Sequence, residues 1–200
     1  MKKKLIALSL ATLLILPMTV VAAEPVTEIA PSFPAVYTSA GLTPEYAAPI
    51  SRAAFSMLTF EAFRTINSGI FPQMQAKNIF SDVGDAPEDM FVVMLYGMGV
   101  VNGIGTDTFA PRRAITRQEA CTMLTRARLR QNPDLYTEII AATNAIDSIK
   151  GADEVKEWAK ESVAYMYATG ILSLKDGSLA PNAEMTTEEA MVLCTAFINA

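Results

Sequence analysis

The sequence predicts an all-α protein built from internal repeats. Apolar residues recur at helical spacing in several segments, and those segments end at glycine or proline, as helices commonly do. Residues 99–126 return in altered form as residues 170–197, and no segment has the pattern of a sustained strand. Three pairs of positions share an offset of 70 residues: Pro111 and Pro181, Ile115 and Met185, Thr116 and Thr186. Repeats of this kind bury their apolar faces against one another, so we expect one domain rather than two.

The first 23 residues are typical of a signal peptide. Lys2, Lys3 and Lys4 form a basic start, residues 5–16 are apolar, and Val21-Ala22-Ala23 offers a cleavage site before Glu24. The apolar run is too short for a transmembrane helix, which needs about 20 residues. We therefore predict a secreted protein whose mature chain starts near Glu24.

The remaining chain divides into an arm and three repeats. Residues 24–49 contain five prolines and predict an extended, proline-rich N-terminal arm with turns. The repeat domain is expected over residues 50–200. Residues 50–70 form an incomplete first repeat that shows only its second helix, because the arm stands where its first helix should be. The second repeat covers 79–130 and the third covers 145–200.

Each full repeat is expected to contain two helices. Residues 89–96 are apolar nearly all round, which predicts a buried first helix in the second repeat. Residues 153–169 supply the first helix of the third repeat, with Trp158 on its apolar stripe. The second helices are expected over 116–130 and 186–199, with a short extra helix or loop over 135–145.

The second helices begin with a capping signal. Thr116 and Glu119 stand three apart before an apolar run, and Thr186 and Glu189 do the same, so we assign all four to helix capping. Arg117 places a cation at the positive end of the helix dipole, which is unfavourable unless an anion binds there. We therefore expect Arg117→Ala to change stability little and to weaken binding of an anionic ligand.

Charge distribution favours an anionic ligand but not nucleic acid. Without the three lysines of the signal segment, 13 basic residues face 21 acidic ones, a net charge of −8. Six arginines nevertheless fall within 19 residues: Arg112, Arg113, Arg117, Arg126, Arg128 and Arg130. A solvated helix face would explain these arginines. Because they lie next to a helix N-terminus that could bind an anion, we interpret them as a binding patch. The acidic total and the export signal argue against nucleic acid.

The composition excludes several kinds of catalysis. The chain has no histidine, which removes Ser-His-Asp and Cys-His catalysis and histidine-bearing zinc sites. Cys121 and Cys194 are the only cysteines and fall at different turns of their helices, so we expect buried free thiols rather than a disulfide. We predict no catalytic residues, no metal site and no cofactor, although a pair of carboxylates could serve a glycan hydrolase.

The second and third repeats resemble the S-layer homology family. The second repeat carries its motif through Phe80-Ser81-Asp82-Val83, Gly99 to Gly103, Phe109-Ala110-Pro111 and Ile115 to Glu119. The third repeat is similar through Trp158-Ala159, Gly170-Ile171-Leu172, Asp176-Gly177, Pro181 and Thr186 to Glu189. The resemblance implies a pseudo-threefold bundle of helix-loop-helix repeats, whose grooves bind a cell-wall polysaccharide bearing pyruvate ketals.

The resemblance also implies the ligand-binding residues. The arginine that meets the ketal carboxylate corresponds to Arg117 in the second repeat and to Arg52 in the first. Gly103, Trp158 and Asp82 occupy further positions of the motif and complete the expected ligand-binding set. The third repeat has Thr187 in place of the arginine and is one residue short around Leu174. We therefore expect the groove of Arg117 to bind best, that of Arg52 less well, and the third not at all.

The sequence thus predicts a non-enzymatic module that anchors the protein non-covalently to the cell wall through an anionic secondary polysaccharide. Two alternatives stay open. The protein could be a structural envelope component whose degenerate repeats serve self-association or a protein partner, or a wall-active glycan hydrolase.

Overall fold

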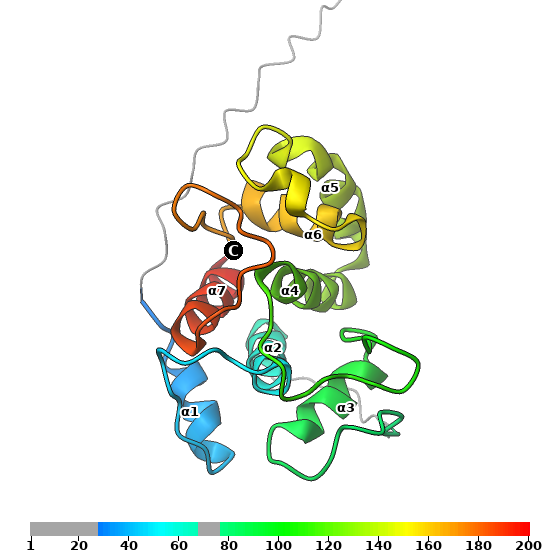
Figure 1. Ribbon diagram of the computed structural model, residues 1–200, viewed down its shortest axis with the longest axis vertical. Coiled ribbons are helices and arrows are strands. Elements are labelled where there is room, and N and C mark those ends of the chain that lie inside the picture. The colour runs from blue at the N-terminus through cyan, green and yellow to red at the C-terminus, as the bar shows by residue number, and fades with distance from the viewer. Residues whose placement is uncertain (1–27, 68–76) are drawn as a thin grey trace, which may run out of the picture.

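The computed structural model describes residues 28–67 and 77–200, and over these residues it is helical and contains no strand (Figure 1). The predicted all-α class is confirmed. The expected signal peptide lies outside the described residues. Within them, no helix is long and apolar enough to span a membrane. The α-helices are α1 (Ser32–Ser39), α2 (Arg52–Ile66), α3 (Asp89–Gly97), α4 (Arg117–Gln131), α5 (Tyr136–Ala141), α6 (Glu157–Ala168) and α7 (Thr187–Asn199).

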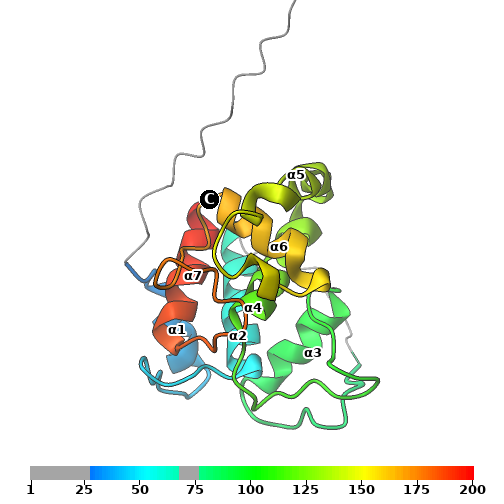
Figure 2. The same ribbon diagram turned by 45° about the horizontal axis from the view of Figure 1, so that its top comes forward.

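The centre of the molecule is formed by α2, α4 and α7, the second helices of the three repeats. All three pack against one another, as Figures 1 and 2 show. Each begins directly after a Ser or Thr N-cap: Ser51, Thr116 or Thr186. Capping boxes are present at the starts of α4 and α7. At the start of α2 the Ser51 hydroxyl accepts the N–H of Ala54, so this helix is capped without a glutamate.

A closed ring of backbone hydrogen bonds joins the three repeats just before these helices. The N–H of Ile115 donates to the carbonyl of Ile50 at 3.0 Å, that of Ile50 to Met185 at 2.9 Å, and that of Met185 to Ile115 at 3.1 Å. All three side chains are buried in the core. Because each residue donates to the next and accepts from the third, the ring gives the fold its pseudo-threefold symmetry.

The first backbone N–H groups of the central helices are also used between repeats. Those of Arg117 and Gln118 donate to the carbonyls of Ala183 and Pro181, each at 3.0 Å. Equivalent pairs of bonds hold the starts of α2 and α7. The helix starts therefore have no free donors with which to bind an anion. This differs from the sequence-based expectation, because neighbouring repeats satisfy the groups that a ligand would have used.

The N-terminal arm contains a helix that the sequence analysis did not predict. α1 is eight residues long, with Pro31 at its N-cap and Pro34 in its first turn, where a missing N–H costs nothing. Phe33 and Tyr37 are buried on its inner face. The first repeat thus has a short first helix, and the prolines set its start rather than preventing it.

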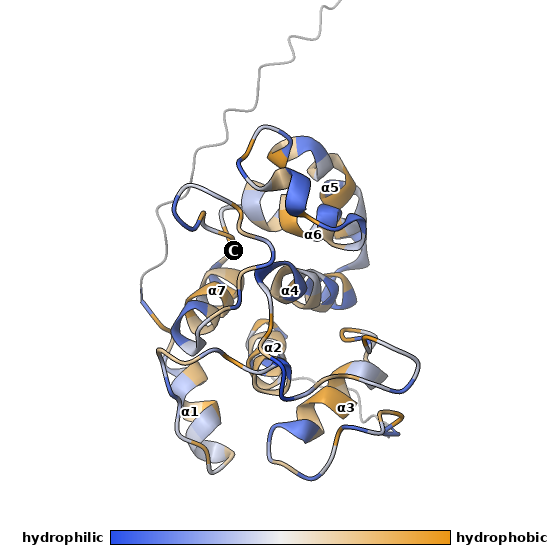
Figure 3. Cartoon of the chain, viewed as in Figure 1, coloured by the Kyte–Doolittle hydropathy of each residue, from blue (hydrophilic) through white to orange (hydrophobic). Residues whose placement is uncertain are grey.

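The helix α3 is only half buried, which differs from the buried helix that its sequence predicts. Val92 and Leu95 face the core, whereas Met90 is 56% exposed and Met94 is 38% exposed. Figure 3 shows hydrophobic residues along the middle of α3, which packs against α2. Apolar residues thus occur on every face of α3, but other helices cover only one of those faces.

The third repeat begins with an insertion. A 3-10 helix (Pro133–Leu135), α5 and a second 3-10 helix (Thr143–Ile146) follow α4, and a third 3-10 helix (Ala152–Glu154) precedes α6. The insertion packs on α6, which packs on α4. This arrangement holds Trp158, the second residue of α6, beside the central helix of the preceding repeat.

Candidate functional site

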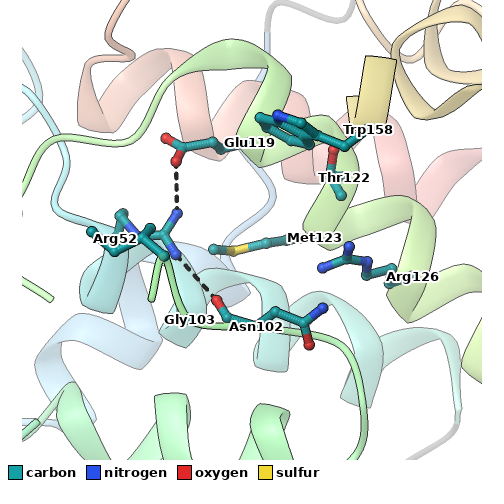
Figure 4. A pocket seen from close by; sticks show the side chains of 9 residues that line it. Arg52, Asn102, Gly103, Glu119, Thr122, Met123, Arg126 and Trp158 are labelled. Atoms are coloured by element: carbon teal, nitrogen blue, oxygen red, sulfur yellow. Dashed lines mark hydrogen bonds and ion pairs between the residues drawn. The ribbon is translucent and has the colours of Figure 1, made fainter. Parts of the chain in front are cut away.

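The first cavity, which we call groove 1, has a volume of about 390 Å³ and draws on all three repeats. The start of α2 contributes one arginine, the loop after α3 contributes backbone and side chains, and α4 and α6 form the walls (Figure 4). Its lining residues are Arg52, Asn102, Gly103, Ile104, Glu119, Thr122, Met123, Arg126 and Trp158.

Arg52 is held tightly at one end of groove 1. Its side chain is almost fully buried, and its Nε donates to the carbonyl of Phe109 at 2.9 Å. Nη1 lies 3.0 Å from the Oε1 of Glu119, and Nη2 lies 3.4 Å from the carbonyl of Asn102. Burial lowers the pKa of Arg52, although the Glu119 carboxylate opposes that shift. Every nitrogen of this guanidinium thus already has an acceptor, and the contacts hold the groove's loop in place.

Glu119 is the carboxylate of groove 1 and is itself fully engaged. Besides Arg52, it accepts hydrogen bonds from Arg113 at 2.5 Å and from the backbone N–H of Thr116 at 3.0 Å. Burial alone would raise the pKa of Glu119, but the hydrogen bonds from Arg113 and Thr116 and the charge of Arg52 together hold it below its usual value. Glu119 therefore stays ionised and links two repeats.

Arg126 is the guanidinium of groove 1 that remains available. It is half-buried, and it has no hydrogen bond or ion pair with any other described residue. Burial lowers the pKa of Arg126. Figure 4 shows its side chain extending into the cavity from the side opposite Arg52, with Trp158 at the edge. Trp158 is 56% exposed, which leaves much of the indole open to solvent.

Gly103 has a steric reason to be glycine. A Cβ at this position would lie 2.6 Å from the carbonyl oxygen of Thr108 and 2.9 Å from a ring carbon of Phe80. Both distances are too short for a side chain, so glycine allows the groove's loop to pack against the core.

Asp82 lines neither groove 1 nor groove 2, and its carboxylate binds backbone N–H groups. Its two carboxylate oxygens accept the backbone N–H groups of Phe109 at 2.9 Å and Ala110 at 2.7 Å. Desolvation would raise the pKa of Asp82, but these two hydrogen bonds, one from its own backbone N–H and the charge of Arg52 together leave the pKa below its usual value. Asp82 thereby fixes a turn in which Ala110 has a positive φ of 59°.

The second cavity, groove 2, has a volume of about 340 Å³ and occupies the equivalent place one repeat later. Arg117 stands where Arg52 stands in groove 1, and its Nε and Nη2 donate to the carbonyls of Leu179 and Ser173 at 3.0 and 2.5 Å. The groove is lined by Arg117, Gly170, Ile171, Leu172, Ser173, Leu174, Lys175, Met185, Glu188, Glu189, Val192, Leu193 and Ala196.

The structure thus divides the residues that the sequence grouped together. Arg52, Gly103 and Trp158 share groove 1, Arg117 lies in groove 2, and Asp82 lines neither. Each arginine packs against the loop of the following repeat, so the arginine of the first repeat meets the well-preserved loop of the second. Arg117 instead meets the shortened loop of the third.

The sequence analysis counted Arg126 only as one of six clustered arginines and did not consider Thr122, although a signal for both was present. Glu119, Thr122 and Arg126 are spaced i, i+3 and i+7, which places them on one face of α4. Their helical spacing from a recognised motif residue could have identified both as groove residues.

Comparison with known proteins agrees with this architecture. Residues 79–121 and residues 152–191 each match the family described as S-layer homology domain. A search of curated proteins found no match to the chain. S-layer homology domains serve cell-surface anchoring in general and are anchoring rather than catalytic modules, which implies association with the cell envelope. The chain is therefore an S-layer homology domain protein, with its two matched repeats in the second and third sectors of the pseudo-threefold bundle.

Proposed function

We propose that this protein is held non-covalently at the cell wall by binding an anionic, pyruvylated secondary polysaccharide in groove 1. The observation that carries the proposal is Arg126, a half-buried guanidinium without a partner among the described residues, in a cavity bordered by the exposed indole of Trp158. Groove 1 is lined by two guanidinium groups and only one carboxylate, so its charge favours an anionic ligand.

The two sides of the ligand would be recognised differently. A ketal carboxylate accepts charge-assisted hydrogen bonds from Arg126, which are about twice as strong as neutral ones. The apolar face of a sugar ring packs on Trp158, whose indole combines a large apolar surface with a polar edge. Asn102 and Thr122 line the space between and offer polar groups to sugar hydroxyls.

In this proposal Arg52 positions the groove and Arg126 binds the anion. The Arg52 guanidinium already donates to Phe109, Glu119 and Asn102, so its main effect is to hold the loop that forms the floor. Groove 2 and Arg117 are not required, since the third repeat lacks the residues equivalent to Thr122, Met123 and Arg126.

Export is part of the same proposal. Residues 1–23 would be removed as a signal peptide, which places the mature protein outside the membrane, where it can meet the wall polymer. Mass spectrometry of the protein from its own host should give a chain that starts near Glu24, recovered with the cell envelope. Recovery from the cytosol with Met1 retained would refute this step.

The binding test is sedimentation of the mature protein with cell walls that carry the polymer and with walls stripped of it. We expect co-sedimentation only with the polymer-bearing walls. Arg126→Ala should weaken binding by about tenfold to a hundredfold, the value of a lost charge-assisted hydrogen bond. Trp158→Ala should also weaken it.

Matched controls lie outside the groove. Arg130→Ala removes an exposed arginine from the same helix, and Tyr136→Ala removes an aromatic side chain that is 57% exposed on α5. Both should bind as the parent does. Equal binding to both kinds of wall would exclude the polymer as the ligand and favour self-association or a protein partner.

A further inference from the structure

The Asn102-Gly103 dipeptide lies in the loop that lines groove 1 and is the only Asn-Gly sequence in the chain. Asn102 is exposed to solvent and Gly103 is half-buried. Glycine has no Cβ, so it is the residue that least hinders an asparagine side chain from reaching the backbone nitrogen that follows it. Attack of that nitrogen on the side-chain amide carbon closes a five-membered ring, which makes this dipeptide a reactive point in the loop.

Neither reacting group is held by a hydrogen bond. The side-chain amide of Asn102 has no hydrogen bond with any other described residue, and the backbone N–H of Gly103 donates to none of them. The next backbone N–H, that of Ile104, donates to the carbonyl of Thr108 at 2.8 Å, so the loop is held beside the reacting peptide but not at it. The Asn102 side chain can therefore turn toward the Gly103 nitrogen, and that nitrogen can lose its proton, without breaking a hydrogen bond of the fold.

A hydrogen bond from Arg52 favours the reactive form of this peptide. Its Nη2 lies 3.4 Å from the carbonyl oxygen of Asn102, which belongs to the same peptide group as the Gly103 nitrogen. Removal of the proton from that nitrogen leaves a negative charge that the nitrogen shares with the carbonyl oxygen. A guanidinium N–H that donates to the oxygen stabilises this charge, so the proton is easier to remove. Arg52 is fixed in this place by its bonds to Phe109 and Glu119.

Asn182 in the third repeat offers an internal comparison, because it has none of these features. It precedes an alanine, and its side-chain amide is bonded to Gln118 at 2.7 Å and to Glu154 at 3.4 Å. The backbone N–H that follows it, that of Ala183, donates to the carbonyl of Ala180 at 3.0 Å. Its amide carbon and the next nitrogen are thus both restrained, so we expect Asn182 to be inert where Asn102 reacts.

We propose that Asn102 is a site of spontaneous deamidation that changes the charge of groove 1. The Gly103 nitrogen loses its proton to hydroxide and forms a bond to Cγ of Asn102. The bond from Cγ to the side-chain nitrogen breaks, and that nitrogen takes a proton from water and leaves as ammonia. Water opens the resulting succinimide at either carbonyl, which gives aspartate or isoaspartate. One water is consumed and one ammonia is released, and no oxidant or reductant takes part.

Either product adds a carboxylate to groove 1. Figure 4 shows the Asn102 side chain extending toward the side of the cavity from which Arg126 enters, and both residues line it. Arg126 has no ion pair with any other described residue, so the new carboxylate supplies a partner tethered to the protein itself. An anionic ligand then has to compete with that partner. The chemical step does not depend on the proposed wall binding, whereas this loss of ligand affinity rests on it.

The first test is incubation of the purified protein at neutral and at mildly alkaline pH, followed by mass spectrometry of its peptides. The peptide with Asn102 should gain the mass difference between an amide and an acid, and should take up label from heavy-oxygen water. Its rate of conversion should rise with pH, because the first step removes a proton, and the peptide with Asn182 should stay unchanged. Asn102→Gln should abolish the conversion, because glutamine cannot form the five-membered ring. An intact Asn102 after conversion of Asn182 would overturn the proposal.

The same measurement in urea tests the contribution of the fold. The hydrogen bond from Arg52 exists only in the folded protein. Conversion of Asn102 should therefore be at least as fast in the folded protein as in the unfolded chain. A folded protein that converts more slowly than the unfolded chain would refute the role assigned to Arg52 and to the open loop.

The second test compares Asn102→Asp, which has the side chain of one product, with Asn102→Gln, which keeps a neutral amide. The NMR signal of the Arg126 Nε–H should shift in Asn102→Asp relative to Asn102→Gln without any ligand present, and equal signals would refute the pairing with Arg126. On polymer-bearing walls Asn102→Asp should bind about tenfold more weakly than Asn102→Gln. Failure of the parent protein to bind these walls would refute the proposed function alone, because the deamidation and the Arg126 signal are measured without them.

Discussion

The Nη1 of Arg52 at the start of α2 lies 3.0 Å from the Oε1 of Glu119 in the first turn of α4, and both side chains are at least 86% buried. This ion pair connects two repeats. Removing one partner of a buried pair leaves the other charge uncompensated, so Glu119→Gln should lower the free energy of unfolding by about 3 kcal/mol. Urea denaturation measures this value. Glu161→Gln, on the exposed face of α6, is the control and should change it by less than about 0.5 kcal/mol.

Stability should also fall at acid pH because of Glu119. Its pKa in the folded protein lies below the ordinary value of 4.5. A carboxyl group with a depressed folded-state pKa stabilises the native state fully above its unfolded pKa and loses that effect as the pH falls through the folded pKa. The melting temperature should therefore drop as the pH is lowered below about 4.5. Glu119→Gln should show a shallower drop, and identical pH profiles would show that Glu119 does not contribute.

Arg117→Ala should destabilise the protein more than Thr116→Ala. The sequence alone suggests the opposite, because a cation in the first turn opposes the helix dipole. In the structure Arg117 is buried and donates to two carbonyl oxygens, so its loss should cost about 3 kcal/mol. Thr116→Ala removes a capping residue and should cost about 1 kcal/mol. Thermal melts of the two variants measure both losses of stability. A smaller loss for Arg117→Ala than for Thr116→Ala would support the expectation from the sequence.

Two glycines of the same loop should respond differently to alanine. Gly103→Ala places a Cβ within 3 Å of two neighbouring atoms, so we expect a loss of about 2 kcal/mol as the loop shifts. At Gly105 the nearest atom to a new Cβ is 3.8 Å away, which is ordinary contact, and Gly105→Ala is the matched control. Comparable melting temperatures for both variants would mean that the loop adapts without strain.

The two cysteines should be unreactive in the folded protein. Cys121 and Cys194 are buried free thiols, as the sequence analysis predicted. Burial raises the pKa of Cys121 to about 12 and also raises that of Cys194, so little reactive thiolate forms at neutral pH. A maleimide reagent should label neither thiol in the native protein and both in urea. Rapid labelling of the native state would show that the core opens easily.

The sequence by itself determined the features that depend on residues close together in the chain. The capping pairs Thr116/Glu119 and Thr186/Glu189 follow from a three-residue spacing, and the helix starts follow from them. The repeat offset and the apolar spacing gave the helical class and the position of the central helices. These interactions lie within one helical turn, so their pattern can be read without knowing the neighbours.

Other features were decided only by the tertiary structure. The sequence cannot show that Arg52 faces the loop of the second repeat and Arg117 that of the third, because a repeat offset does not tell which neighbour a helix start packs against. The hydrogen-bond ring through Ile50, Ile115 and Met185 makes that choice. Separate hydrogen bonds between repeats use the first N–H groups of the central helices, so the positive charge available in groove 1 lies on Arg126 and not at a helix N-terminus.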